Sequence, residues 1–156
     1  MRIGVAIGAA ALCLTAGLAA AQTSPDVLKS GVDDKGGLMI AAGDRMIVRI
    51  GPDWRPTLDR IEPAGAPAGR VPGGEVSLTL TIDPELGSTL QVQSGLSKPL
   101  RYQARIAIVR GGEVLEAPVT TCPVRPRMVS VDSWPRPIQG VHVVSFSGAG
   151  RDRSCR

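Results

Sequence analysis

The chain has 156 residues, a formal net charge of +4 and few aromatic residues, at 3% of the total. Proteins that bind nucleic acids usually carry a dense basic stripe with aromatic platforms. Here arginines are interleaved with acids, so we expect no nucleic-acid partner. The last third of the chain is locally basic, and we interpret it as a solvated surface. The 13 prolines and 19 glycines favour many turns and few long helices.

The N-terminus has the pattern of a secretory signal peptide. Arg2 is followed by an apolar run from Ile3 to Ala21 that ends in three alanines. A positive residue, an apolar core and small residues before the cut are the features that export signals share. We therefore predict a helical signal peptide over residues 1–21, a periplasmic or secreted location, and no transmembrane segment after cleavage. The alternative is an N-terminal membrane anchor, because the run is just long enough to span a bilayer.

Two cysteines remain once the signal peptide, with Cys13, is removed. Cys122 and Cys155 make an even count in an oxidising compartment, which indicates one disulfide. Their spacing is not that of a redox motif or a zinc site. We predict that the bond anchors a polar C-terminal tail.

Short β-strands alternate with turns through the rest of the chain. Residues 22–36 are polar and are expected to form a loose N-terminal segment. The clearest strands lie within residues 75–113, where Leu78 and Leu80 alternate with threonines. A period of two gives a strand one dry face and one wet face. The expected strands, in chain order, are residues 38–42, 45–50, 57–62, 76–82, 89–93, 102–108, 118–122, 128–131 and 139–147.

Three breaks in the pattern predict local features. Residues 63–74 contain three prolines and four glycines, which indicates a surface loop, or alternatively a mobile partner-binding arm. Gly111 and Gly112 fit a two-residue hairpin turn, since such turns need positive φ. The adjacent Val143 and Val144 interrupt the alternation and indicate a bulge or a strand buried on both faces.

These patterns predict one all-β domain over residues 37–156. We expect an antiparallel two-sheet sandwich, immunoglobulin-like, of about eight short strands, with a closed barrel as the alternative. The core residues that we expect are Leu78, Leu80, Leu90, Val92, Tyr102, Ala104, Ile106 and Val129.

His142 is the one histidine in the chain, and it lies in a predicted strand. A Ser-His-Asp site needs a base that reaches both a nucleophile and a carboxylate. Strand alternation predicts that Ser145 and Ser147 face away from His142, so we expect no catalytic residues. The alternative is a small exported hydrolase that uses His142.

Asp33, Asp34 and Asp44 flank a predicted hairpin. Calcium sites need several oxygen ligands at defined spacing, so we expect these carboxylates to cap turns. The chain has no cluster of histidines and cysteines, and we expect neither a metal nor a cofactor.

Two tryptophans are braced by prolines, and each has an arginine close by in sequence. Trp54 and Arg55 lie between Pro52 and Pro56. In the second motif, Trp134 and Arg136 alternate with Pro135 and Pro137. Tryptophan and arginine are enriched at binding hot spots, so these four residues are candidate partner-binding residues. The alternative is that each indole covers an open end of the sandwich.

The sequence therefore predicts an exported, non-catalytic module that binds a protein or a cell-envelope component. Besides the hydrolase, a second alternative is a periplasmic protease-inhibitor-like protein that presents the loop of residues 63–74.

Overall fold

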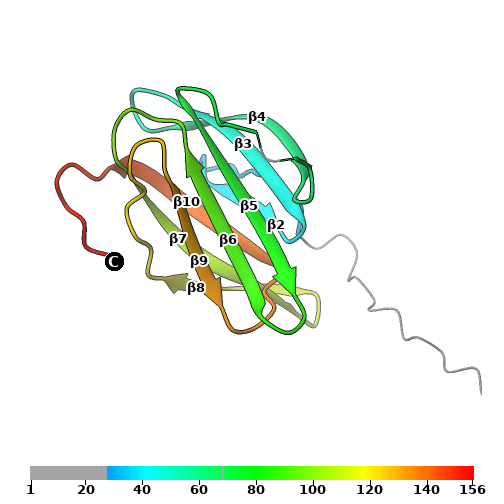
Figure 1. The fold of residues 1–156 in the computed structure, drawn as a ribbon. Helices are drawn as coiled ribbons and strands as arrows, with labels where there is room; N and C mark the ends of the chain where they lie inside the picture. The colour runs from blue at the N-terminus through cyan, green and yellow to red at the C-terminus, as the bar shows by residue number, and fades with distance from the viewer. Residues whose placement is uncertain (1–27, 68) are drawn as a thin grey trace, which may run out of the picture.

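Two antiparallel sheets of five strands each pack face to face (Figure 1). The computed structural model of the chain describes residues 28–67 and 69–156, so the predicted signal peptide lies outside the described residues. The prediction of an all-β, two-sheet antiparallel sandwich is confirmed. The two sheets are separate, with no strand in common among the described residues, which excludes the closed barrel.

The first sheet has the strand order β1-β2-β10-β7-β8. Its strands are β1 (Gly31–Val32), β2 (Leu38–Ala41), β10 (Gly140–Gly148), β7 (Leu100–Arg110) and β8 (Glu113–Val119). The second sheet has the order β4-β3-β5-β6-β9. Its strands are β4 (Pro56–Pro63), β3 (Asp44–Ile50), β5 (Glu75–Asp83), β6 (Gly87–Ser94) and β9 (Val129–Trp134). The edge strands of the two sheets are therefore β1, β8, β4 and β9.

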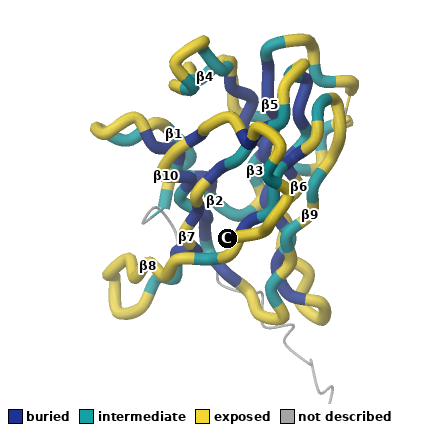
Figure 2. Tube along the Cα trace, turned by 90° about the vertical axis from the view of Figure 1, so that its left-hand side faces the viewer, coloured by how far each residue is buried: buried dark blue, intermediate teal, exposed yellow. Residues whose placement is uncertain are grey.

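The core lies between the sheets and consists of residues from strands of both sheets, and Figure 2 colours the buried residues along the chain dark blue. Every predicted core residue except one is buried. The exception is Val129, whose side chain is 44% exposed. In β9 the inward positions belong to Ser130, Asp132 and Trp134, so the valines of this edge strand face solvent. The prediction for Val129 was wrong because alternation alone does not say which of the two faces is the dry one.

The loop of residues 63–74 lies over part of the outer face of the second sheet. The guanidinium of Arg45 donates to the carbonyls of Ala66 and Pro67, at 3.3 and 3.1 Å, and pairs with Glu62 at 2.5 Å. Ile47, on the outer face of β3, is buried as a result. The loop is therefore held by its backbone to a buried arginine.

The hairpin between β7 and β8 confirms one turn prediction and corrects one strand. Gly111 and Gly112 have φ of 59° and 86°, as the two-residue turn requires. This turn places Glu113 opposite Arg110, so β8 begins at Glu113 and ends at Val119. The strand predicted at residues 118–122 lies too far along the chain. The glutamates of β8 obscure the alternation of apolar and polar residues by which this strand would be recognised.

No helix that could cross a membrane occurs within residues 28–67 and 69–156.

The correction at β9 can be tested by removing the same two methyl groups from two neighbouring strands. Val92→Ala in β6 should lower the free energy of unfolding by roughly 2–4 kcal/mol, because Val92 is fully buried and a cavity remains. Val129→Ala should change it by no more than about 0.5 kcal/mol. Urea unfolding of both variants measures this, and equal losses would contradict the assignment of the β9 faces.

Candidate functional site

His142 sits between two carboxylates on the outer face of the first sheet. Its Nε2 lies 2.7 Å from Asp33 Oδ2, and its Nδ1 lies 2.9 Å from Glu116 Oε1. Asp33 follows β1, His142 is in β10 and Glu116 is in β8, so the imidazole joins three segments that are distant in sequence. Arg105 lies 3.5 Å from the other oxygen of Glu116 and extends the charged row.

Both nitrogens of this imidazole are engaged, which leaves neither for a nucleophile. The register shift between Val143 and Ser145 confirms the predicted bulge. The bulge turns Ser145 and Ser147 to the same outer face as His142, so the expectation of opposite faces was wrong. The Ser145 hydroxyl nevertheless contacts Gln103 Oε1, at 3.5 Å, rather than the imidazole. The geometry is that of a structural hydrogen-bonded cluster and gives no support to the hydrolase alternative.

Of the aspartates near the first hairpin, Asp33 caps a turn as predicted, whereas Asp44 binds a side chain of a separate segment. Asp33 Oδ1 accepts the N–H groups of Lys35 and Gly37, each at 2.8 Å. The Gly37 N–H, helped by Lys35 and His142, holds the pKa of Asp33 below its ordinary value. Asp44 accepts the hydroxyl of Ser30 at 2.6 Å. Within the described ranges, no three histidine, cysteine, aspartate or glutamate side chains are arranged to hold a metal ion.

Trp54 covers one end of the sandwich. It lies in the β3–β4 turn with φ of 65°, a backbone conformation that costs a bulky residue of order 1–2 kcal/mol. Its indole packs against the core and over Gly148, where an added Cβ would lie 2.8 Å from the ring. Neighbouring Arg55 points into solvent, with 88% of its side chain exposed.

Trp134 covers the opposite end of the second sheet. It is the last residue of β9, pairs with Ser88 at the start of β6, and packs against the core. Arg136 is exposed in the following turn. The structure thus separates the two tryptophan sites instead of joining them. The contacts of both indoles support the role of covering the ends of the core.

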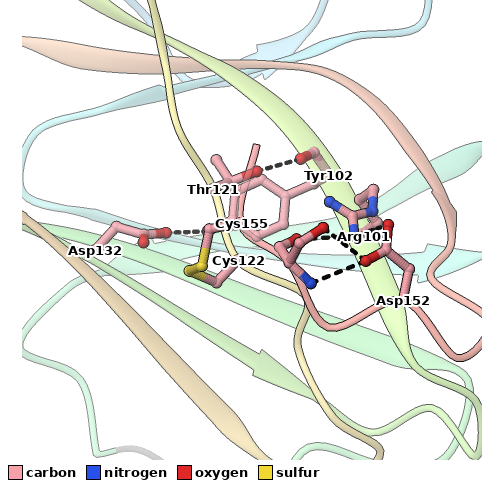
Figure 3. The surroundings of a disulfide bond; sticks show 8 residues. Arg101, Tyr102, Thr121, Cys122, Asp132, Asp152 and Cys155 are labelled. Carbon is pink, nitrogen blue, oxygen red and sulfur yellow. Dashed lines mark hydrogen bonds and ion pairs between the residues drawn. A yellow bond between two sulfur atoms is a disulfide. The ribbon is translucent and has the colours of Figure 1, made fainter.

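The Cys122–Cys155 disulfide is present, which confirms the predicted pairing (Figure 3). Beside it, Thr121 and Arg156 exchange two backbone hydrogen bonds, of 2.7 and 3.0 Å. Asp152 is a second anchor, because Arg101, in β7, reaches its Oδ2 at 3.1 Å, while Arg156, within the tail, reaches the same oxygen at 2.8 Å. The tail is therefore fastened to β7 and to the segment that leads from β8 to β9.

Tyr102 and Asp132 form a polar link between the sheets that the sequence did not reveal. The phenol of Tyr102, in β7, donates to Asp132 Oδ2, in β9. The ring is buried and the Thr121 hydroxyl donates to the Tyr102 carbonyl at 2.5 Å. Burial, reinforced by Asp132, raises the pKa of Tyr102 well above its ordinary value. This bond holds the Asp132 side chain on the inner side of β9, so its carboxylate does not add a charge to the outer side of the strand.

Among the described strands, β9 has a free edge at which exposed apolar side chains occur beside unpaired backbone groups. Val129 and Val131 are 44% and 57% exposed, and Met128 immediately precedes them and is also exposed. The Ser94 N–H donates to the Met128 carbonyl at 2.9 Å. Because the bonding direction alternates along an antiparallel strand, the N–H and C=O groups of Val129, Val131 and Ser133 point away from β6. The residues that expose apolar side chains thus also offer unpaired backbone groups.

Comparison of this chain with protein-family models, with curated proteins and with solved structures found no match. Only its own geometry therefore bears on its function.

The link between the sheets can be tested with Tyr102→Phe. This variant keeps the ring but leaves Asp132 without its donor, so we expect the free energy of unfolding to fall by about 1–3 kcal/mol at neutral pH. The raised pKa means that the folded state favours the protonated phenol. The stabilisation is thus complete below the unfolded pKa of about 10 and is lost as pH rises above it.

Urea unfolding of the parent and of the variant from pH 7 to pH 11 measures both effects. The parent should lose stability as the pH rises above about 10, and the variant should not, because it has no phenol at position 102 to ionise. Tyr102 is the one tyrosine in the chain, so tyrosinate absorbance reports on it alone. Ionisation of the phenol near pH 10 in the folded protein would contradict the buried link.

The disulfide should stabilise the fold through the loop that it closes. The two cysteines are 33 positions apart, and the double variant Cys122→Ala/Cys155→Ala should lose about 3–4 kcal/mol of unfolding free energy. A reducing agent should produce a similar loss in the parent and none in the variant. An unchanged urea midpoint after verified reduction would show that other contacts hold the tail.

Proposed function

We propose that the chain is an exported, non-catalytic module that binds an extended segment of another protein along the free edge of β9. The observation that carries this proposal is the coincidence, on β9, of exposed valines with unpaired backbone groups. A peptide that adds itself to such an edge gains main-chain hydrogen bonds, and its alternate side chains meet those of the edge strand.

The other three edges carry the protection that usually prevents strand addition. β8 has exposed apolar residues too, but also Glu113, Glu116 and Pro118. β4 begins and ends with proline and has charged residues between. β1 is only two residues long. Natural proteins use charges, prolines and short strands to keep open edges from pairing. Within β9 the one charged residue is Asp132, and it is turned inward.

The charges around β9 favour an acidic partner. Arg127 precedes the strand and Arg136 follows it, and neither has an ion pair with a described residue. A second copy of the chain, paired antiparallel about Val131, would bring Arg127 of one copy near Arg136 of the other. Like charges at such positions are destabilising. The fitting occupant is therefore a segment with apolar residues at alternate positions and acidic residues at both ends.

The two alternatives have less support. The imidazole of His142 is held by Asp33 and Glu116, which leaves a hydrolase without a base. The loop of residues 63–74 is tied down by Arg45, whereas an inhibitor must offer an extended segment to its protease. The Cys122–Cys155 bond supports export to an oxidising compartment, whether periplasmic or extracellular.

A synthetic peptide can test the proposal. The probe is Asp-Glu-Val-Thr-Val-Thr-Val-Glu-Asp with a fluorescent label, and a second peptide has lysines in place of the acids. We expect saturable binding of the acidic peptide and not of the basic one. Val131→Glu should weaken the binding at least about tenfold, because it removes the apolar contact and adds a charge of the same sign as that of the peptide. The matched control Val114→Glu, on the β8 edge, should leave the binding unchanged.

A second variant tests the contribution of the backbone to binding apart from that of the side chain. Val131→Pro removes an N–H that points to the open edge, so it should abolish peptide binding without breaking a bond to β6. Loss of the same size in the Val114→Glu control, or no binding of either peptide, would overturn the proposal. A dimer in light scattering that Val131→Glu dissociates would show instead that β9 pairs with a second copy.

A further inference from the structure

A cleft of about 690 Å³ opens between the tail and the segment that leads into β9. Arg125 lies on one side of the cleft, and Arg151 and Arg153 lie on the other. All three are exposed, and none has an ion pair with a described residue. Three positive charges thus face one hollow without local neutralisation, which concentrates a positive potential there.

The acidic residue of the lining does not cancel these charges. Asp152 is already engaged by Arg101 and Arg156, and its Oδ1 accepts the hydroxyl and the N–H of Ser154, at 2.6 and 2.9 Å. These partners, the Ser154 hydroxyl first, lower the pKa of Asp152 below its ordinary value. Its carboxylate is committed to holding the tail.

The walls of the cleft are fixed in place from both sides. The Cys122–Cys155 bond and the paired backbone of Thr121 and Arg156 clamp the tail at its far end. At its near end the Ala149 N–H donates to the Pro99 carbonyl at 3.0 Å. Pro99, Pro123 and Pro126 form much of the remaining surface. A site that is held in this way loses little conformational entropy when a ligand enters.

We propose that this cleft binds a ligand that carries two phosphate groups. The planar fork of an arginine matches a phosphate with two parallel hydrogen bonds. Each phosphate carries at least one negative charge and offers more acceptor oxygens in its ionised or esterified form than a carboxylate does, so two phosphates satisfy three arginines better than two carboxylates do. The volume is that of a pocket for a small molecule, and the proline walls suit the uncharged body that joins the phosphates. The lining has no aromatic residue on which a base could stack, which argues against a nucleic acid.

Such a ligand could be soluble or could be the headgroup of an anionic lipid. Calorimetry with inorganic pyrophosphate tests the soluble form, and orthophosphate tests the need for two groups. Sedimentation with vesicles of phosphatidylcholine, with and without cardiolipin, tests the lipid form. We expect pyrophosphate to bind saturably, at least about tenfold more tightly than orthophosphate. Vesicle binding that requires cardiolipin would identify a lipid source, and pyrophosphate binding without it would identify a soluble one.

The double variant Arg151→Gln/Arg153→Gln should weaken pyrophosphate binding at least about tenfold. The control Arg55→Gln/Arg110→Gln removes the same charge at exposed positions outside the cleft, and it should weaken binding no more than about twofold. Both variants change exposed side chains, and equal melting temperatures would show that they fold alike. Equal loss in the two variants, or no saturable binding of pyrophosphate or of cardiolipin vesicles, would overturn the proposal. Neither variant touches β9, so the result is independent of the proposed peptide binding.

Discussion

The structure depends on one constraint, which is that each sheet has an apolar face that only the other sheet covers. Leu78 and Leu90 of one sheet and Tyr102 and Val141 of the other belong to the same buried cluster. Because burial of these side chains is the main favourable term in folding, the two sheets stabilise each other and neither would persist alone. The strands at the rim take part in this burial least, and the features that suggest function lie there.

The rim is closed by different means at different places. Trp54 and Trp134 cover the two ends of the second sheet with indoles, and the disulfide ties the tail to the segment before β9. Along β9 the inner face is polar, and the bond from Tyr102 to Asp132 replaces apolar packing with a link between the sheets. A buried polar pair of this kind fixes the position of β9 more specifically than apolar contacts do, because its geometry is directional. The edge that results is well supported and open.

The two proposed sites share one connecting segment, residues 120–128, between β8 and β9. This segment carries Arg125 into the cleft and Arg127 to the start of β9, and Cys122 fastens it to the tail. A partner strand on β9 and a phosphate ligand in the cleft would therefore act on neighbouring parts of the same backbone. Rigid support beneath a loop is a common arrangement for binding surfaces, since loops carry recognition and the scaffold sets their position.

The sequence by itself determined the class of the fold, most of the core and the covalent bond. Alternation in residues 75–113 identified β5, β6 and β7, the paired glycines identified the β7–β8 turn, and the count of cysteines identified the disulfide. These are local signals or simple counts, so they need no knowledge of what lies across the sheet. Only the tertiary structure decided which face of β9 is dry, that Asp33 and Glu116 meet at His142, that Arg45 holds the loop of residues 63–74, and that three arginines line one cleft. Each of these four arrangements brings together residues from separate strands or loops. The distances between such residues depend on how the strands pair in the two sheets, and the spacing of residues along the chain does not encode that pairing.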